Sequence, residues 1–137
     1  MFDDGIDRLL AYHGRRYWLA NGWSLRFRIW RVAPNDRRPH GIRYSFTLHD
    51  EAGHRILGFD NSHSVNRRKI EHDHWHRFRR TDDLVPYEYR DADTLLVDFF
   101  KAVEASCKSE AVGLEIAFED QDGADTNRSE DYDADTD

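Results

Sequence analysis

Apolar and polar residues alternate in two segments of the first half of the chain. In residues 23–32 large apolar side chains fill the odd positions up to Ile29, while Ser24, Arg26 and Arg28 fill the even ones. Residues 42–48 repeat the pattern, with apolar side chains at the even positions. A period of two places one side of a strand in a core and the other outside it. We therefore expect two half-buried strands, the first with a cationic polar side.

Weaker patterns predict the remaining elements. Strands are expected at 55–60 and 74–80, with a short edge strand at 114–118. Apolar residues at near-helical spacing predict a helix over 6–18, which Asn21-Gly22 would end. A final helix is expected after Asp91 or Asp93, either of which can cap it. Its apolar stripe consists of Leu95, Leu96, Phe99, Phe100 and Val103.

This order of elements predicts the α+β class, an antiparallel β-sheet meander with N- and C-terminal helices packed on one face. Trp23, Phe27, Phe46, Phe99 and Phe100 are expected in the core. The helices leave the other face of the sheet to solvent or a ligand, and the alternation places arginines there.

Length and composition bound the organisation of the chain. Its 137 residues suit a single domain, expected over 1–118. Residues 119–137 hold nine acids against one arginine and no aliphatic side chain larger than alanine, so we expect a disordered acidic tail. One cysteine excludes an internal disulfide, and no apolar run is long enough for a bilayer, so a cytoplasmic protein is expected.

The overall net charge of −7 averages two opposite regions. Residues 8–80 contain sixteen Lys and Arg against six acids, a balance of +10, together with all eight histidines. Residues 81–137 contain four basic residues against eighteen acids, a balance of −14. Such an asymmetry indicates a half that faces a polyanion, although the basic residues could instead pair internally.

Histidines spaced by two residues stand close to the chain's strongest basic cluster. On a strand, His72, His74 and His76 would project from one face, about 7 Å apart between successive Cβ atoms. Imidazole titrates near neutral pH, so two such rings can serve as base and acid at one centre. RNA carries its own nucleophile, the 2′-hydroxyl, so an enzyme needs only these two proton transfers and a cation for the transition state. Arg77 suits that last task.

Basic and aromatic residues around this cluster are candidates for holding RNA. The cationic positions on the polar strand face and in the neighbouring loop and strand are Arg26, Arg28, Arg67, Arg68, Lys69, Arg79 and Arg80. The candidates for stacking on unpaired bases are Trp75, Phe78, Tyr87 and Tyr89. Trp75 fits the core equally well.

A metal site and a merely polar sheet face are open alternatives. Asp60 and four histidines (63, 72, 74 and 76) offer oxygen and nitrogen ligands for Zn²⁺ or another divalent ion. Alternating histidines alone are only moderately specific for metal.

Four segments of the chain follow one another as in the TumE family. They are 44–50, 55–63 with its Gly-Phe-Asp-Asn-Ser-His block, the histidine cluster 72–76, and 95–100. The chain resembles that family over about residues 20–105. The resemblance implies a toxin of a type II toxin–antitoxin module, a ribonuclease that inhibits translation, with a RelE-like layout and a helix-turn-helix antitoxin as partner.

Carried over by position, the resemblance implies a shared polar set of Asp60, Asn61, His63 and the histidines 72, 74 and 76. Our leading hypothesis is a metal-independent endoribonuclease without a cofactor. His63 and one of the other three histidines would be base and acid, while Asp60 and Asn61 orient the rings. Its RNA target, on or off the ribosome, is open. The alternatives are a non-catalytic module that binds nucleic acid or protein, and a metal-dependent phosphoesterase.

Overall fold

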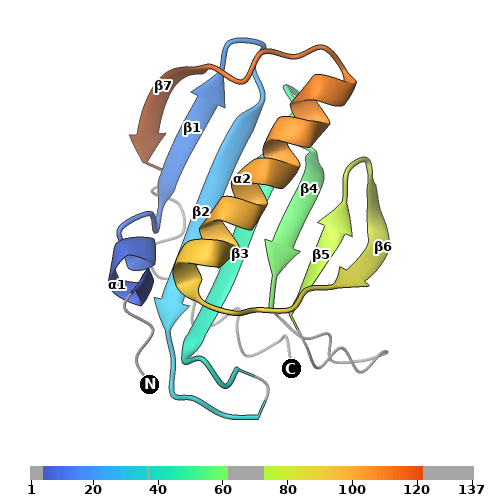
Figure 1. Cartoon of the computed structure of the whole chain (residues 1–137). Coiled ribbons are helices and arrows are strands. Elements are labelled where there is room, and N and C mark those ends of the chain that lie inside the picture. Colours follow the sequence, from blue (N-terminus) through green and yellow to red (C-terminus); the bar gives the residue numbers. More distant parts are fainter. Residues whose placement is uncertain (1–4, 37, 62–72, 122–137) are drawn as a thin grey trace.

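A single antiparallel sheet organises the part of the chain that the computed structural model describes, residues 5–36, 38–61 and 73–121. Within those ranges the sheet has seven strands in the order β6-β5-β4-β3-β2-β1-β7, and two helices accompany it (Figure 1). The strands are β1 Arg15–Leu19, β2 Ser24–Arg31, β3 Ile42–His49, β4 Arg55–Asp60, β5 His74–Arg77, β6 Arg80–Pro86 and β7 Ile116–Gln121. The helices are α1 Gly5–Leu10 and α2 Ala92–Ser109.

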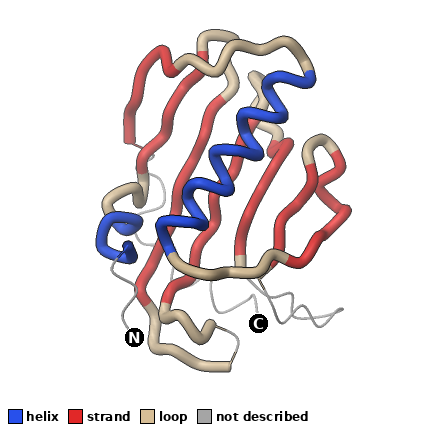
Figure 2. The backbone as a smooth tube through the Cα atoms, in the orientation of Figure 1, coloured by secondary structure: helices blue, strands red, loops and turns tan. Residues whose placement is uncertain are grey.

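Helix α2 lies diagonally across one face of the sheet (Figure 2). Phe99 at its centre is fully buried, and its ring lies 5.5–5.6 Å from the rings of Phe27, Phe46 and Phe59 on β2, β3 and β4. Helix α1 packs against α2 and β2. The predicted α+β class and meander are confirmed, because β1 to β6 pair in chain order. The expected RelE-like layout stays a prediction.

The sequence located the long helix correctly. Asp91 is its N-cap, and its carboxylate accepts a hydrogen bond of 2.7 Å from the backbone N–H of Thr94. The helix is not the last element, however. The chain continues into β7, which pairs with β1 at the edge of the sheet and extends three residues beyond the expected domain end at 118. Residues 122–137, most of the predicted tail, lie outside the described residues.

The predicted helix over 6–18 is wrong in its second half. Helix α1 ends at Leu10, and Gly14, with φ +82°, precedes a strand that contains Trp18. Asn21-Gly22 is the turn of the β1–β2 hairpin, where Gly22 has φ +93°. The Asn-Gly pair is a hairpin signal as well as a helix breaker, and here it forms a hairpin.

The predicted strand at 74–80 is in fact two strands. β5 stops at Arg77 and the chain reverses at Phe78 and Arg79 into β6, which the sequence did not predict. Arg79 has φ +58°, a left-handed conformation usual for glycine rather than arginine. Its guanidinium donates two hydrogen bonds to Glu110 at 2.6 and 2.9 Å. This long-range ion pair, and a hydrogen bond of 2.7 Å from the Arg79 backbone N–H to the carbonyl oxygen of Ile56, accompany a turn that has no local sequence signal.

No helix in the described residues is long and apolar enough to cross a bilayer.

Replacing Phe99 with alanine tests the core. We expect Phe99→Ala to lower the free energy of unfolding by about 3–5 kcal/mol, because it removes a buried ring that contacts three strands. Val97→Ala in the same helix is the matched control, since Val97 is 51% exposed, and it should change stability little. Urea unfolding followed by circular dichroism measures both. Equal losses for the two variants would contradict this description of the core.

Candidate functional site

The side of the sheet that faces away from α2 carries polar side chains, and we call it the polar face. Residues opposite one another on neighbouring strands share a face. One cross-strand row, from β2 to β5, consists of Arg28, Ser45, Asp60 and His74. The next row, from β1 to β5, consists of Arg16, Arg26, Thr47, Gly58 and His76. The alternation that predicted a cationic face is therefore confirmed for Arg26 and Arg28.

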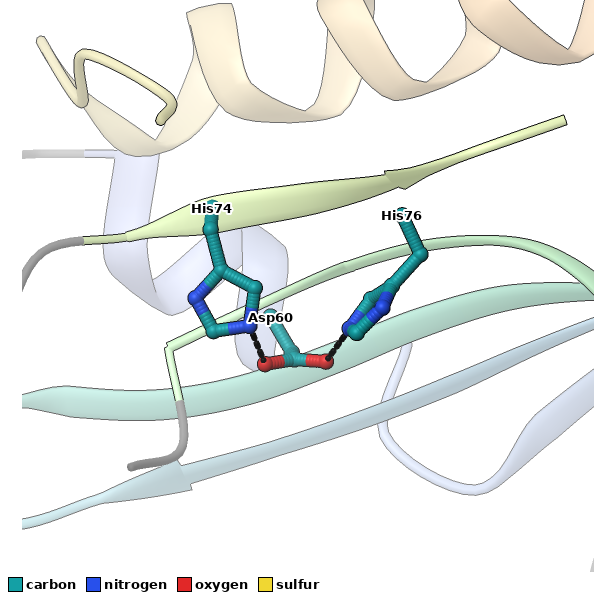
Figure 3. A group of neighbouring side chains, drawn as sticks. All are labelled: Asp60, His74 and His76. Carbon is teal, nitrogen blue, oxygen red and sulfur yellow. Dashed lines mark hydrogen bonds and ion pairs between the residues drawn. The ribbon is translucent and has the colours of Figure 1, made fainter. Parts of the chain in front are cut away.

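Asp60 and two histidines form a compact cluster on the polar face. Figure 3 shows both rings extending from β5 on the side away from α2 toward the carboxylate on β4. His74 Nε2 lies 2.9 Å from Asp60 Oδ1, and His76 Nε2 lies 3.0 Å from Asp60 Oδ2. The three side chains are 7–12% exposed, so the face is more enclosed here than the sequence indicated.

The cluster's hydrogen bonds define its charge. Burial alone would raise the pKa of Asp60, but the hydrogen bonds and positive charge of His74 and His76 outweigh it and hold that pKa well below its usual range. His76 Nδ1 lies 2.7 Å from the carbonyl oxygen of Thr81, which can only accept, so this nitrogen carries a proton. Both ring nitrogens of His76 therefore face acceptors.

A third histidine lies two rows from Asp60 on the same face. His49 Nδ1 is 3.1 Å from the carbonyl oxygen of Gly53 and donates to it, so Nε2 is the nitrogen that accepts from the Thr47 hydroxyl at 2.8 Å. Burial lowers the pKa of His49 to about 4, and the positive charges of Arg26, Arg55 and Arg28 act in the same direction. His49 is thus a neutral acceptor at neutral pH. The alternation along β3 is a signal that could have placed His49 on the polar face, but the sequence hypothesis assigned no role to this histidine.

The remaining predicted catalytic residues are not all in the cluster. His63 and His72 lie outside the described residues, as do Arg67, Arg68 and Lys69. Asn61 is buried, but its side chain accepts from the backbone N–H of Tyr44 at 3.0 Å and donates to the carbonyl of Ile42 at 2.9 Å. Asn61 therefore extends the β3–β4 pairing, and its predicted role in orienting an imidazole stays a prediction.

Three predicted cations lie on the opposite side of the sheet. Arg77 and Arg80 line a cavity beside α2, next to Trp75 and Phe78. Arg79 is ion-paired with Glu110. Arg77 follows His76 in β5, so strand alternation places it on the α2 side, and the chain reverses before it reaches Arg80. Arg77, to which the sequence hypothesis assigned transition-state stabilisation, thus lies on the opposite side of the sheet from the imidazoles. The arginines that share cross-strand rows with the imidazoles are Arg16, Arg26 and Arg28.

Three of the four predicted stacking residues are also on the α2 side, and the fourth, Tyr89, stacks on His40 with 3.8 Å between the ring centroids. Trp75 and Tyr87 pack against Phe59, and Phe78 packs against Trp23. The polar face has other aromatic rings, which the sequence analysis missed. Trp18 stacks on Phe118 at 5.8 Å beneath the guanidinium of Arg16, and Trp30 lies 4.4 Å from the guanidinium of Arg43. The alternation of β2 is sufficient to predict Trp30 on this face. Trp18 was missed because the sequence analysis placed it in a helix, where strand alternation does not apply.

The fold and the cluster define a small α+β protein with an Asp-His-His group on one sheet face. Comparison with known families then identifies it, because the family of the toxin TumE matches residues 11–107, most of the chain. The chain belongs to the TumE toxin family, as the resemblance indicated, and membership implies an antitoxin partner. No curated protein and no solved structure matches the chain.

The lowered pKa of His49 predicts a loss of stability in mild acid. The unfolded chain takes up a proton near the ordinary value of 6.5, whereas the folded ring does so only near 4. The contribution is therefore complete above about pH 6.5 and is lost as the pH falls to 4. We expect the free energy of unfolding to fall by about 1–2 kcal/mol over this range, less than for a fully enclosed ring because solvent reaches His49.

His49→Gln should flatten this part of the stability profile, measured by urea unfolding at several pH values. His54→Gln is the matched control, because the His54 side chain at the hairpin is 79% exposed. A profile that stays steep in His49→Gln would place the titrating group elsewhere.

Proposed function

We propose that this toxin is an endoribonuclease whose RNA substrate binds across the polar face, with the Asp60-His74-His76 cluster at the scissile phosphate. One observation carries the proposal: the cluster shares two cross-strand rows with Arg26 and Arg28. Ionisable groups and cations are thereby gathered on one rigid face of a protein from a toxin family.

The chemistry of RNA cleavage fits this set of groups. The 2′-hydroxyl attacks the neighbouring phosphorus, the bond to the 5′-oxygen breaks, and negative charge builds on the phosphoryl oxygens. Arginine stabilises such charge through paired N–H donors. Arg28 is two strands from Asp60 in the same row, about 10 Å between backbones, a span that an arginine and a phosphate can bridge.

Aromatic rings beside arginines favour a single-stranded substrate. Phe118 is 56% exposed and stacks on Trp18, with Arg16 over the indole at 5.1 Å. An unpaired base can extend such a stack while the guanidinium meets the phosphate beside it. This combination supports RNA with unstacked bases over a regular duplex.

The two imidazoles of the cluster act as a unit. Asp60 engages Nε2 of both rings, and Thr81 engages Nδ1 of His76. His76 can exchange a proton with RNA only if it leaves one of these partners, so we assign it a positioning role. We therefore assign one proton transfer to His63, as in the sequence hypothesis. We assign the other to a group that is bound by Asp60, His74 and His76 and is not itself one of these side chains.

The antitoxin partner that the family implies is, in our proposal, a helix-turn-helix protein that blocks the polar face. An acidic segment suits this task, because opposite charge steers it to the arginines and excludes RNA from the same rows.

A non-catalytic RNA-binding module is the competing function, and it predicts a different response to mutation. Binding by charge alone falls with salt and depends little on any one side chain. Cleavage instead depends strongly on single groups at the reacting phosphate.

A pair of arginine variants tests which face is active. We expect Arg28→Gln to reduce RNA cleavage about 10-fold or more, because it removes a donor from the row that holds Asp60 and His74. Arg77→Gln is the matched control on the α2 side and should stay within about twofold of the unmodified protein. Cleavage is followed on labelled single-stranded RNA, with folding verified by circular dichroism.

Growth arrest on expression in a bacterial host gives an independent readout. Arg28→Gln should weaken the arrest, and Arg77→Gln should leave it close to that of the unmodified protein. Greater sensitivity at Arg77 would overturn the assignment of the polar face. An unmodified protein that binds RNA with strong salt dependence, and cleaves none, would favour the binding module.

A further inference from the structure

The contact between His76 and Asp60 requires a positive charge at a defined place. The Nδ1–H of His76 donates to Thr81, so a neutral ring has only a lone pair at Nε2. An ionised carboxylate is also an acceptor only. Two lone pairs would then face each other at 3.0 Å, between Nε2 and Asp60 Oδ2. A proton or a metal ion must lie between them.

The identity and number of the three groups suit a metal ion. Two imidazoles and one carboxylate are the set that holds divalent first-row transition metals while leaving positions open. The ligand atoms of Asp60, His74 and His76 all lie within 4.8 Å of one another. Ligand atoms around such an ion are about 3.0–3.4 Å apart for bonds of about 2.1 Å, and the two N···O separations of 2.9 and 3.0 Å are close to this range. The two imidazoles contact different oxygens of Asp60, so binding one ion would require their rings to turn toward a shared position.

The surroundings of the cluster resemble those of metal-binding imidazoles. A ligating histidine characteristically donates its other N–H to a carbonyl or carboxylate, which directs the free nitrogen at the metal. Thr81 does this for His76. The ligands stand on two paired strands, with Asp60 directly opposite His74, and their low exposure limits competition from water.

We propose that Asp60, His74 and His76 form a binding site for one divalent transition-metal ion, of which Zn²⁺ is the probe. Nitrogen ligands disfavour Mg²⁺ and Ca²⁺, which prefer oxygen. The site goes beyond the metal-independent mechanism of the sequence hypothesis. Its function in cleavage rests on the proposed ribonuclease activity: the ion would help arginine to stabilise the phosphoryl oxygens and would activate the attacking hydroxyl, a task otherwise left to histidine.

Zinc titration of the full-length protein tests the site without RNA. After chelator treatment and dialysis, isothermal titration calorimetry should give a saturable site with about one Zn²⁺ per chain. His74→Gln and His76→Gln should each weaken this site at least about 10-fold, because glutamine can still donate to Asp60 but is a poor ligand. Mg²⁺ should not compete. His54→Gln, at the exposed hairpin, is the control and should bind like the unmodified protein.

Two results would overturn the proposal. One is the absence of a saturable Zn²⁺ site in folded protein, and the other is Zn²⁺ affinity unchanged in both glutamine variants, which would locate the binding at other histidines or acids. Circular dichroism establishes that each variant is folded. A loss of Zn²⁺ affinity in both glutamine variants excludes a local structural defect in one of them as the cause.

RNA assays keep the two proposals separate. Zinc binding at the cluster in a protein that cleaves no RNA would sustain the metal site and reject the ribonuclease. RNA cleavage that persists after chelation, in protein without a zinc site, would sustain the ribonuclease and reject the metal.

Discussion

The contact of Phe99 with three aromatic rings of the sheet is the constraint on which the rest of the structure depends. It assigns the apolar sides of β2, β3 and β4 to α2 and makes that face the core. Burial of large rings is the main favourable term for a chain of this size. Because side chains alternate along a strand, the other face is then available for polar groups, and it carries Asp60, His74, His76, Arg26 and Arg28.

Asp60 links this architecture to chemistry. Its carboxylate is the shared partner of two imidazoles, so a one-residue change in the pairing of β4 and β5 would place the rings and the carboxylate on opposite faces. A buried carboxylate is costly unless positive groups neutralise it. The same contacts that offset this cost also direct both ring nitrogens to one carboxylate, so they stabilise the sheet and organise the site together.

Sequence reasoning succeeded where a side chain's position follows from local alternation. Arg26, Arg28, Asp60, His74 and His76 were all predicted on strands, and the faces of the first two and the common face of the two histidines follow from a period of two. It failed where a distant contact decides the conformation. Arg79 adopts a left-handed turn against Glu110, and the chain reverses into β6 where one continuous strand was expected. Arg77, in contrast, lies on the α2 side through the ordinary alternation of β5, which places it opposite to His76.

The misplaced N-terminal helix has a similar cause. Arg15–Leu19 forms a strand because β2 and β7 lie on both sides of it, and one of these partners is about a hundred residues away in sequence. Trp18 consequently escaped notice as a polar-face aromatic. Of the two pairings of β1, only the one with β2 has a sequence signal, the Asn21-Gly22 hairpin turn.

Strand β7 brings an internal competitor to the edge of the polar face. It lies beyond residues 11–107, the part that matches the family, and its Asp120 forms two hydrogen bonds with Arg16 at 2.9 and 3.0 Å while also accepting from Trp18. A tethered carboxylate acts at a high effective concentration. In the proposed function, a phosphate group could bind Arg16 only by displacing this carboxylate, so β7 would raise the affinity that a polyanion needs at this edge.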